Sequence, residues 1–178
     1  MSLLWRRGTL GALALLVLAL AALLADDDPG GAPESTGGAR RAPGDLVAAH
    51  VSRVVDGDTI EVVVLDGTEE DVRYIGVDTP ETVKPDTPVQ CYGPEASAFN
   101  HEFVEGRDVE LRFDRELRDV YGRLLAYVYV GDALVNAELV RRGLARTLEI
   151  EPNTAMAGRL GQLESEAAAA GRGLWGAC

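Results

Sequence analysis

The chain has 178 residues, which is enough for one domain with a sizeable core, and its formal charge is -12. Lys84 is its only lysine, so nearly all of its positive charge comes from arginine. Such acidity opposes long-range attraction to nucleic acid and excludes binding through a generally basic surface. A nucleic-acid enzyme of this composition must concentrate positive charge locally or use a metal ion.

The first 25 residues have the features of a membrane or export signal. Residues 9–25 form an uncharged apolar run, which follows two arginines and precedes three aspartates. The run is slightly longer than a usual signal h-region and lies at the short end for a spanning helix. We predict an uncleaved membrane anchor with its arginines on the cytoplasmic side, and a cleaved signal peptide is the alternative. Both place the remaining chain outside the cytoplasm, either membrane-anchored or secreted.

Residues 26–45 are rich in Gly, Pro, Ser and Ala and show no hydrophobic period. This composition predicts a disordered linker, so we expect the folded domain to span residues 46–178. Its first half has the pattern of β-structure, because β-branched residues recur and Asp66-Gly67 is a hairpin turn. Strands are expected at residues 46–55, 59–65 and 71–77.

A proline-containing loop, residues 79–92, separates these strands from a mixed second half. Gly93-Pro94-Glu95 starts a helix that ends at Gly106. We then expect strands at 108–115 and 124–130, helices at 135–142 and 156–170, and an extended segment at 145–150. The predicted fold is α+β and mainly β: a five-stranded barrel of the OB type with about three helices.

Two acidic turn motifs stand at opposite ends of the predicted β segment. Residues 56–59 read DGDT and residues 78–81 read DTPE, with Arg73 between them. A hairpin would bring both turns to one point, where hard oxygen ligands suit Ca²⁺ and an arginine could grip a phosphate. Both motifs also occur as ordinary turns and loops, which is the alternative interpretation.

Five motifs in order resemble the staphylococcal nuclease (thermonuclease) family. They read VVDGDT, RYIGVDTPE, YGPEASAF, YGRLLAYVYV and LVNAELVRRGLA, and the resemblance runs from about residue 51 to residue 175. Members of that family are Ca²⁺-dependent endonucleases on an OB-type barrel that hydrolyse phosphodiester bonds of DNA and RNA. By motif, Asp58 and Asp78 match the calcium carboxylates, and the backbone carbonyl of Thr79 matches a further ligand.

The resemblance also implies the catalytic residues. Glu81 matches the carboxylate that positions or deprotonates the attacking water. Arg73 and Arg123 match the two arginines that grip the phosphate, and Tyr121 matches a tyrosine that contacts the nucleotide phosphate. Because these residues are all present, we predict an enzyme; a non-catalytic OB-fold module that binds nucleic acid or protein is the alternative.

The substrate pocket departs from the family pattern. Val120 stands where the family has a lysine, and Glu149 and Glu151 lie in the region where the type member has aromatic residues. These changes predict weaker nucleotide binding, unless both acids face solvent. His50 and His101 lie outside the matching motifs, and we interpret both as ordinary surface residues.

Cys91 and Cys178 are the only cysteines. In a domain outside the cytoplasm they are expected to form a disulfide, and two free thiols are the alternative. The expected partners are a DNA or RNA substrate and, if residues 9–25 are retained, a membrane. We infer no protein partner and expect a monomer.

Overall fold

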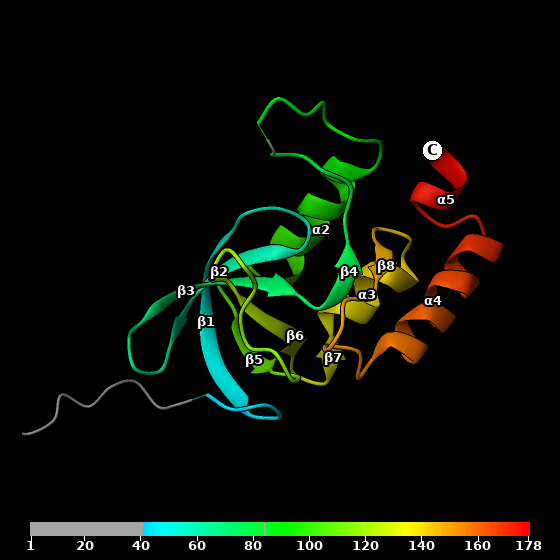
Figure 1. Ribbon diagram of the computed structural model, residues 1–178. Helices are drawn as coiled ribbons and strands as arrows, with labels where there is room; N and C mark the ends of the chain where they lie inside the picture. The colour runs from blue at the N-terminus through cyan, green and yellow to red at the C-terminus, as the bar shows by residue number, and fades with distance from the viewer. Residues whose placement is uncertain (1–40, 84) are drawn as a thin grey trace, which may run out of the picture. The chain divides into compact units, whose positions relative to one another are not determined.

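A closed barrel of five strands forms the body of this computed structural model, which describes residues 41–83 and 85–178 (Figure 1). The strands are β1 (Leu46–Val54), β2 (Thr59–Val64), β3 (Glu69–Tyr74), β5 (Asp108–Arg112) and β6 (Leu124–Val130). They pair antiparallel in the order β3-β2-β1-β5-β6, and a parallel pairing of β3 with β6 closes the barrel. This topology confirms the predicted α+β, mainly β fold with an OB-type barrel.

The helices cover the outside of the barrel. Within the described residues these are α2 (Gly93–Val104), α3 (Val135–Arg141), α4 (Ala157–Ala169) and the short α5 (Leu174–Ala177). None of them is both long and apolar enough to cross a membrane. The predicted anchor or signal, residues 1–25, and most of the predicted linker lie outside the described part of the chain.

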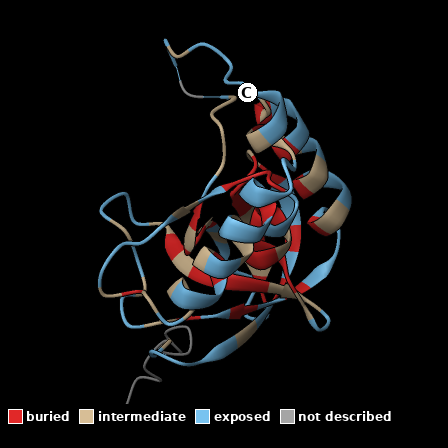
Figure 2. Cartoon of the chain, turned by 90° about the vertical axis from the view of Figure 1, so that its right-hand side faces the viewer, coloured by how far each residue is buried: buried red, intermediate tan, exposed pale blue. Residues whose placement is uncertain are grey.

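The core follows from alternation along the strands. In β2, Ile60, Val62 and Val64 point inward and are almost fully buried, while the residues between them are partly exposed. Figure 2 shows the buried positions gathered between the barrel and the helices that pack on it. In α2 the buried stripe includes a polar residue, Asn100, at the same helical spacing as its apolar neighbours.

The strand expected at residues 71–77 is wrong as a single element. It breaks after Tyr74, and β4 (Gly76–Asp78) leaves the barrel to pair antiparallel with β8 (Arg146–Leu148). Gly76 makes the break possible, because its φ of 79° is a left-handed conformation that disfavours other residues. A Cβ there would also lie 2.6 Å from Leu160 Cδ1. The break carries Asp78 away from the barrel.

The strand expected at residues 108–115 is also shorter than predicted. β5 ends at Arg112, because the backbone N–H groups of Arg115 and Glu116 donate to Asn153 Oδ1 at 3.0 and 2.8 Å. Before β1, the N–H of Gly44 donates to the carbonyl of Phe113 at 3.1 Å. A two-residue strand, β7 (Ala133–Leu134), and α5 were not expected from the sequence.

Candidate active site

A buried chain of hydrogen bonds fixes the first acidic turn. The N–H of Asp58 donates to Asp56 Oδ1 at 3.0 Å, which closes the turn locally. Asn100 Nδ2 donates to the carbonyl of Asp56 at 2.8 Å, and the hydroxyl of Tyr74 donates to Asn100 Oδ1 at 2.9 Å. Helix α2 and strand β3 therefore hold this turn from inside the protein.

Asp58 joins the two acidic turns. Its Oδ2 accepts hydrogen bonds from the N–H of Thr79 at 2.7 Å and from Thr79 Oγ1 at 2.9 Å. Gly57 permits this approach, because a Cβ there would lie 2.6 Å from Thr79 Oγ1. The pKa of the Asp58 carboxyl is raised to about 6, because the effect of burial, with a smaller contribution from Asp56, outweighs the lowering by Arg73 and by the hydrogen bonds from Thr79. The hairpin thus brings both turns together, as the sequence predicted.

Arg73 lies between the two aspartates. Its Nη1 donates to the carbonyls of Tyr74 and Val77 at 3.0 and 2.8 Å, which fixes the plane of the guanidinium. Its Nε lies 3.3 Å from Asp58 Oδ1, and its Nη2 lies 3.1 Å from Asp78 Oδ1. One cation therefore faces two carboxylates, of which Asp58 is almost fully buried and Asp78 is largely exposed.

The donor set fits a hard cation. Asp58 presents a buried carboxylate and Asp78 a second one toward the same guanidinium, and oxygen ligands of this kind suit Ca²⁺. In residues 41–83 and 85–178 no group of three or more His, Cys, Asp and Glu side chains is arranged to hold a metal ion. The expected calcium site has only two carboxylate side chains, those of Asp58 and Asp78, together with the backbone carbonyl of Thr79. That these three groups bind calcium stays a prediction.

Glu81 belongs to a loop that is fastened at both ends. Its Oε1 accepts hydrogen bonds from the N–H groups of Thr82 and Val83 at 2.8 and 2.9 Å. Its backbone N–H donates to Gln90 Oε1 at 3.0 Å, and its carbonyl accepts from the N–H of Gln90 at 2.9 Å. Cys91, the residue after Gln90, forms the predicted disulfide with Cys178, and the two Cα atoms lie 6.0 Å apart. The carboxylate is therefore oriented by its neighbours, and the loop end is covalently tied.

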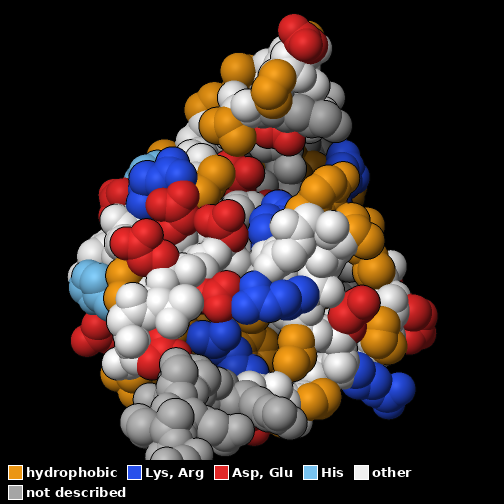
Figure 3. Space-filling view, turned by 60° about the vertical axis from the view of Figure 1, so that its left-hand side comes forward, with side chains coloured by type: hydrophobic (Ala, Val, Ile, Leu, Met, Phe, Trp, Pro, Cys, Tyr) orange, Lys and Arg blue, Asp and Glu red, His pale blue; other side chains and the backbone are white. Residues whose placement is uncertain are grey.

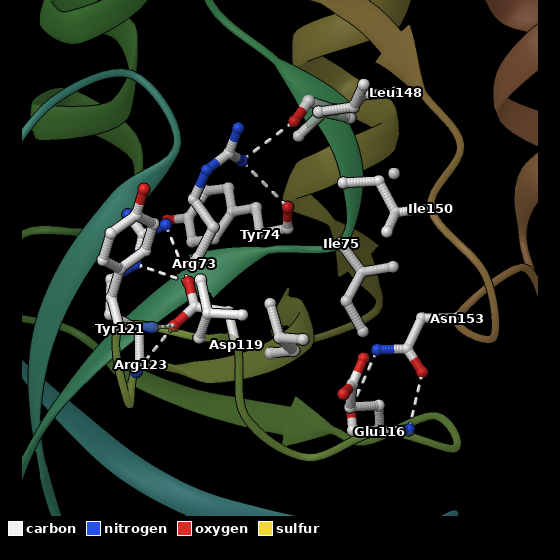
Figure 4. Close-up of a pocket in the computed structure, with 14 residues that line it drawn as sticks. Arg73, Tyr74, Ile75, Glu116, Asp119, Tyr121, Arg123, Leu148, Ile150 and Asn153 are labelled. Atoms are coloured by element: carbon white, nitrogen blue, oxygen red, sulfur yellow. Dashed lines mark hydrogen bonds and ion pairs between the residues drawn. The ribbon is translucent and has the colours of Figure 1, made fainter.

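Arg123 is held by a residue that the sequence analysis did not single out. Its Nε donates to Asp119 Oδ2 at 2.8 Å, and its Nη2 lies 2.7 Å from the same oxygen. Asp119 Oδ1 accepts from the backbone N–H groups of Tyr121 and Arg123 at 2.9 and 3.0 Å. The guanidinium carbon lies 5.5 Å from the centre of the Tyr121 ring. Figure 4 shows Asp119 and Arg123 joined in this way beside Tyr121.

A cavity of about 340 Å³ connects the two arginines (Figure 4). Its lining includes Arg73 and Arg123 on one side and an apolar wall on the other, formed by Ile75, Leu148 and Ile150. Pockets that combine apolar walls with a few convergent polar groups are typical ligand sites.

Glu149 and Glu151, which the sequence placed near the nucleotide base, do not line this cavity. Leu148 and Ile150 do, while Glu149 and Glu151 are exposed and absent from the lining. The structure therefore favours the alternative in which both acids face solvent. Val120 lines the cavity and is 93% exposed. The cavity wall that this segment contributes is therefore aliphatic, not acidic.

On the face drawn in Figure 3, positively and negatively charged side chains are interspersed rather than separated. Figure 3 shows arginine side chains lying among carboxylates on one face. His50 and His101 are exposed, as expected, and each lies 2.9 Å from an acid, Asp108 and Glu105 respectively. Neither histidine lines the cavity.

Three supporting residues were missed from the sequence. Asp119 could have been found from its place two residues before Tyr121, because Asp commonly accepts from the N–H two residues later. Asn100 could have been found as a polar residue within an apolar helical stripe. Gln90 gives no local signal, since its bonds to Glu81 depend on how the loop closes.

Comparisons with known proteins agree with this geometry. A family model described as "Staphylococcal nuclease homologue" matches residues 71–177. The thermonuclease of Staphylococcus intermedius is 48% identical over 125 residues, which cover 70% of this chain and 74% of that protein. The thermonuclease of Staphylococcus hyicus is 46% identical over 125 residues, covering 70% and 73%. Endonuclease YncB of Bacillus subtilis is 50% identical over 111 residues, covering 61% and 52%.

Proposed function

The chain belongs to the staphylococcal nuclease family, and we propose that it is a calcium-dependent endonuclease that hydrolyses phosphodiester bonds of DNA, RNA or both. One observation carries this proposal: Asp58 and Asp78 converge on Arg73, which lines the same cavity as Arg123. Two arginines beside a pair of hard oxygen ligands form a site for a phosphodiester.

Asp58, Asp78 and the carbonyl of Thr79 would hold the calcium ion. When bound there, calcium supplies positive charge that offsets the negative charge developing on the phosphate oxygens. The charge balance supports this role, because the single positive charge of Arg73 faces two carboxylates, Asp58 and Asp78, and a second cation would offset their remaining negative charge.

The remaining residues bind and orient the substrate. Arg73 and Arg123 donate to the non-bridging oxygens of the scissile phosphate, where their planar groups can form paired hydrogen bonds. Tyr121 is 82% exposed at the cavity rim, so its hydroxyl can reach the same phosphate. Glu81, oriented by Thr82 and Val83, holds the attacking water and accepts its proton.

The disulfide supports a location outside the cytoplasm. Disulfides persist in oxidising compartments, and Cys91–Cys178 closes a long stretch of the domain. An anchored or secreted enzyme would follow from residues 1–25, according to whether that segment is retained.

Cleavage assays with purified protein test the proposal. Wild-type protein should degrade plasmid DNA, RNA or both in Ca²⁺ and stop when the calcium is chelated. Glu81→Gln and Arg123→Ala should lower kcat by ~10²-fold or more, as expected for lost transition-state contacts. Failure of the wild type to cut either polymer in Ca²⁺ would favour the non-catalytic OB-fold module instead.

A further inference from the structure

Strands β4 and β8 place one more arginine on the face that carries the cavity. Arg146 lies directly opposite Asp78 in the antiparallel register, and Leu148 lies opposite Gly76. Opposed residues of paired strands share a face, and residues two apart on one strand do too. Because Leu148 lines the cavity, Arg146 and Asp78 lie on that same face. Figure 1 shows the two strands side by side.

The intervening residue confirms this orientation. Thr147 points the other way, toward α4, where its N–H and Oγ1 donate to the carboxylate of Glu164 at 2.9 and 2.6 Å. The side chain of Arg146 therefore leaves β8 on the side opposite to Thr147, and the residue is exposed.

Arg146 is held by an aromatic ring and not by an acid. Its guanidinium carbon lies 4.2 Å from the centre of the Trp175 ring. Across the two described stretches, 41–83 and 85–178, no carboxylate forms an ion pair with Arg146, although Asp78 lies opposite it. A stacked guanidinium keeps its N–H groups directed outward in its own plane, so they can donate hydrogen bonds to an anion.

The segment that carries Trp175 is itself fixed. The N–H of Leu174 donates to the carbonyl of Gly143 at 2.9 Å, and Cys178 is bonded to Cys91. Gly143 and Gly173 permit this contact, because a Cβ on either would lie 2.2 Å from a backbone oxygen of the other segment. The ring that supports Arg146 is thus a rigid platform.

We propose that Arg146, held by Trp175, is a second phosphate contact, which binds a phosphate of the substrate strand beyond the scissile one. The inference rests on the proposed nuclease function. Arg73 and Arg123 already face carboxylates, whereas Arg146, which has no acid partner in the described part of the chain, adds a cation next to the metal-site carboxylate Asp78. Local positive charge of this kind offsets the acidity of the whole chain toward a polyanion.

Substrates of different length distinguish a contact to a distant phosphate from a structural role of Arg146. We would compare Arg146→Ala with wild type on a dinucleotide, which has one phosphodiester, and on a single-stranded oligonucleotide of about eight nucleotides, at constant Ca²⁺. The KM for the oligonucleotide should rise on the order of 10-fold, and the KM for the dinucleotide should rise much less. The slope of log kcat/KM against log salt should become shallower by about 0.7 for the oligonucleotide.

Two further variants serve as controls. Arg107→Ala removes the same charge three residues beyond α2, at the end of that helix away from the Glu81 loop, and should change neither KM nor the salt slope. Arg146→Lys keeps the charge, so it should restore the salt slope while only partly restoring KM.

Three outcomes would overturn the inference. An equal loss on both substrates, or a large fall in the melting temperature of Arg146→Ala, would mean that Arg146 and Trp175 only stabilise the fold. If neither KM value nor the salt slope changes, the strand does not pass Arg146. Failure of the proposed function itself is distinct, because the wild type would then cleave neither substrate.

Discussion

Removal of the Cys91–Cys178 bridge should destabilise the domain by several kcal/mol. The bridge joins residues 87 apart, and the chain-entropy relation gives about 4.6 kcal/mol at 25 °C for a loop of this length. Measured bridges typically contribute ~2–4 kcal/mol. We therefore expect the double variant Cys91→Ser/Cys178→Ser to lose about 2–4.6 kcal/mol of unfolding free energy, which corresponds to a fall in Tm of roughly 7–16 °C for a domain of this size.

Removal of the disulfide should also impair catalysis, because Cys91 is next to a residue that holds Glu81. Gln90 precedes Cys91 and forms two hydrogen bonds with the backbone of Glu81. Without the bridge the end of this loop is held by weaker contacts, so the carboxylate of Glu81 spends less time in its working orientation. We expect kcat to fall several-fold, less than in Glu81→Gln, where the carboxylate is lost.

Equilibrium urea denaturation of wild type and double variant measures the first effect, and calcium-dependent cleavage at a temperature where both are folded measures the second. Mass spectrometry without reductant should show the two-hydrogen deficit of the bridge. The single variant Cys91→Ser is the matched control and should equal the double variant in stability. A loss below about 1 kcal/mol together with an unchanged kcat would refute this account of the bridge.

Four further outcomes are expected. Asp58→Ala and Asp78→Ala should each abolish calcium-dependent cleavage and weaken calcium binding in titration calorimetry, since each removes a charged ligand. Arg123→Lys should lower kcat by ~10²-fold in steady-state assays while leaving the Tm close to wild type, because a point charge lacks the planar fork. Leu148→Tyr should lower KM by ~10-fold at nearly constant kcat through base stacking, while Glu149→Tyr, outside the cavity, should leave KM unchanged. Calcium and a nucleoside bisphosphate should each raise the other's affinity, which calorimetric titration of one with and without the other measures.

The barrel could be predicted because its signals are local. Alternating apolar residues in segments such as β2, and glycine-containing turns such as Asp66-Gly67, indicate strands and hairpins without knowledge of the whole fold. The break at Gly76 could not be predicted in this way. It depends on the pairing of β4 with β8, about 70 residues later in the chain, which competes with continuation of β3.

The site residues also differ in whether local sequence signals or distant strand pairing determine their positions. Asp58, Asp78 and Arg73 could be grouped from two turn motifs and one hairpin, and the structure brings them together. The face of residues 148–151 could not be oriented, because strict alternation allows either the acids or the aliphatic residues to face the substrate. Only the register of β8 against β4 decides that Leu148 lines the cavity.

The hydrogen-bond donors of Arg73 explain why calcium and a phosphate should each favour binding of the other. A guanidinium has five N–H groups, and Nη1 of Arg73 already serves the carbonyls of Tyr74 and Val77. Its Nε and Nη2 face Asp58 and Asp78, so without a metal ion these carboxylates compete with a phosphate for the same edge. A calcium ion held by both carboxylates would satisfy them and release that edge. A phosphate bound there would in turn lower the repulsion between Arg73 and the ion, so each ligand favours the other through this one side chain.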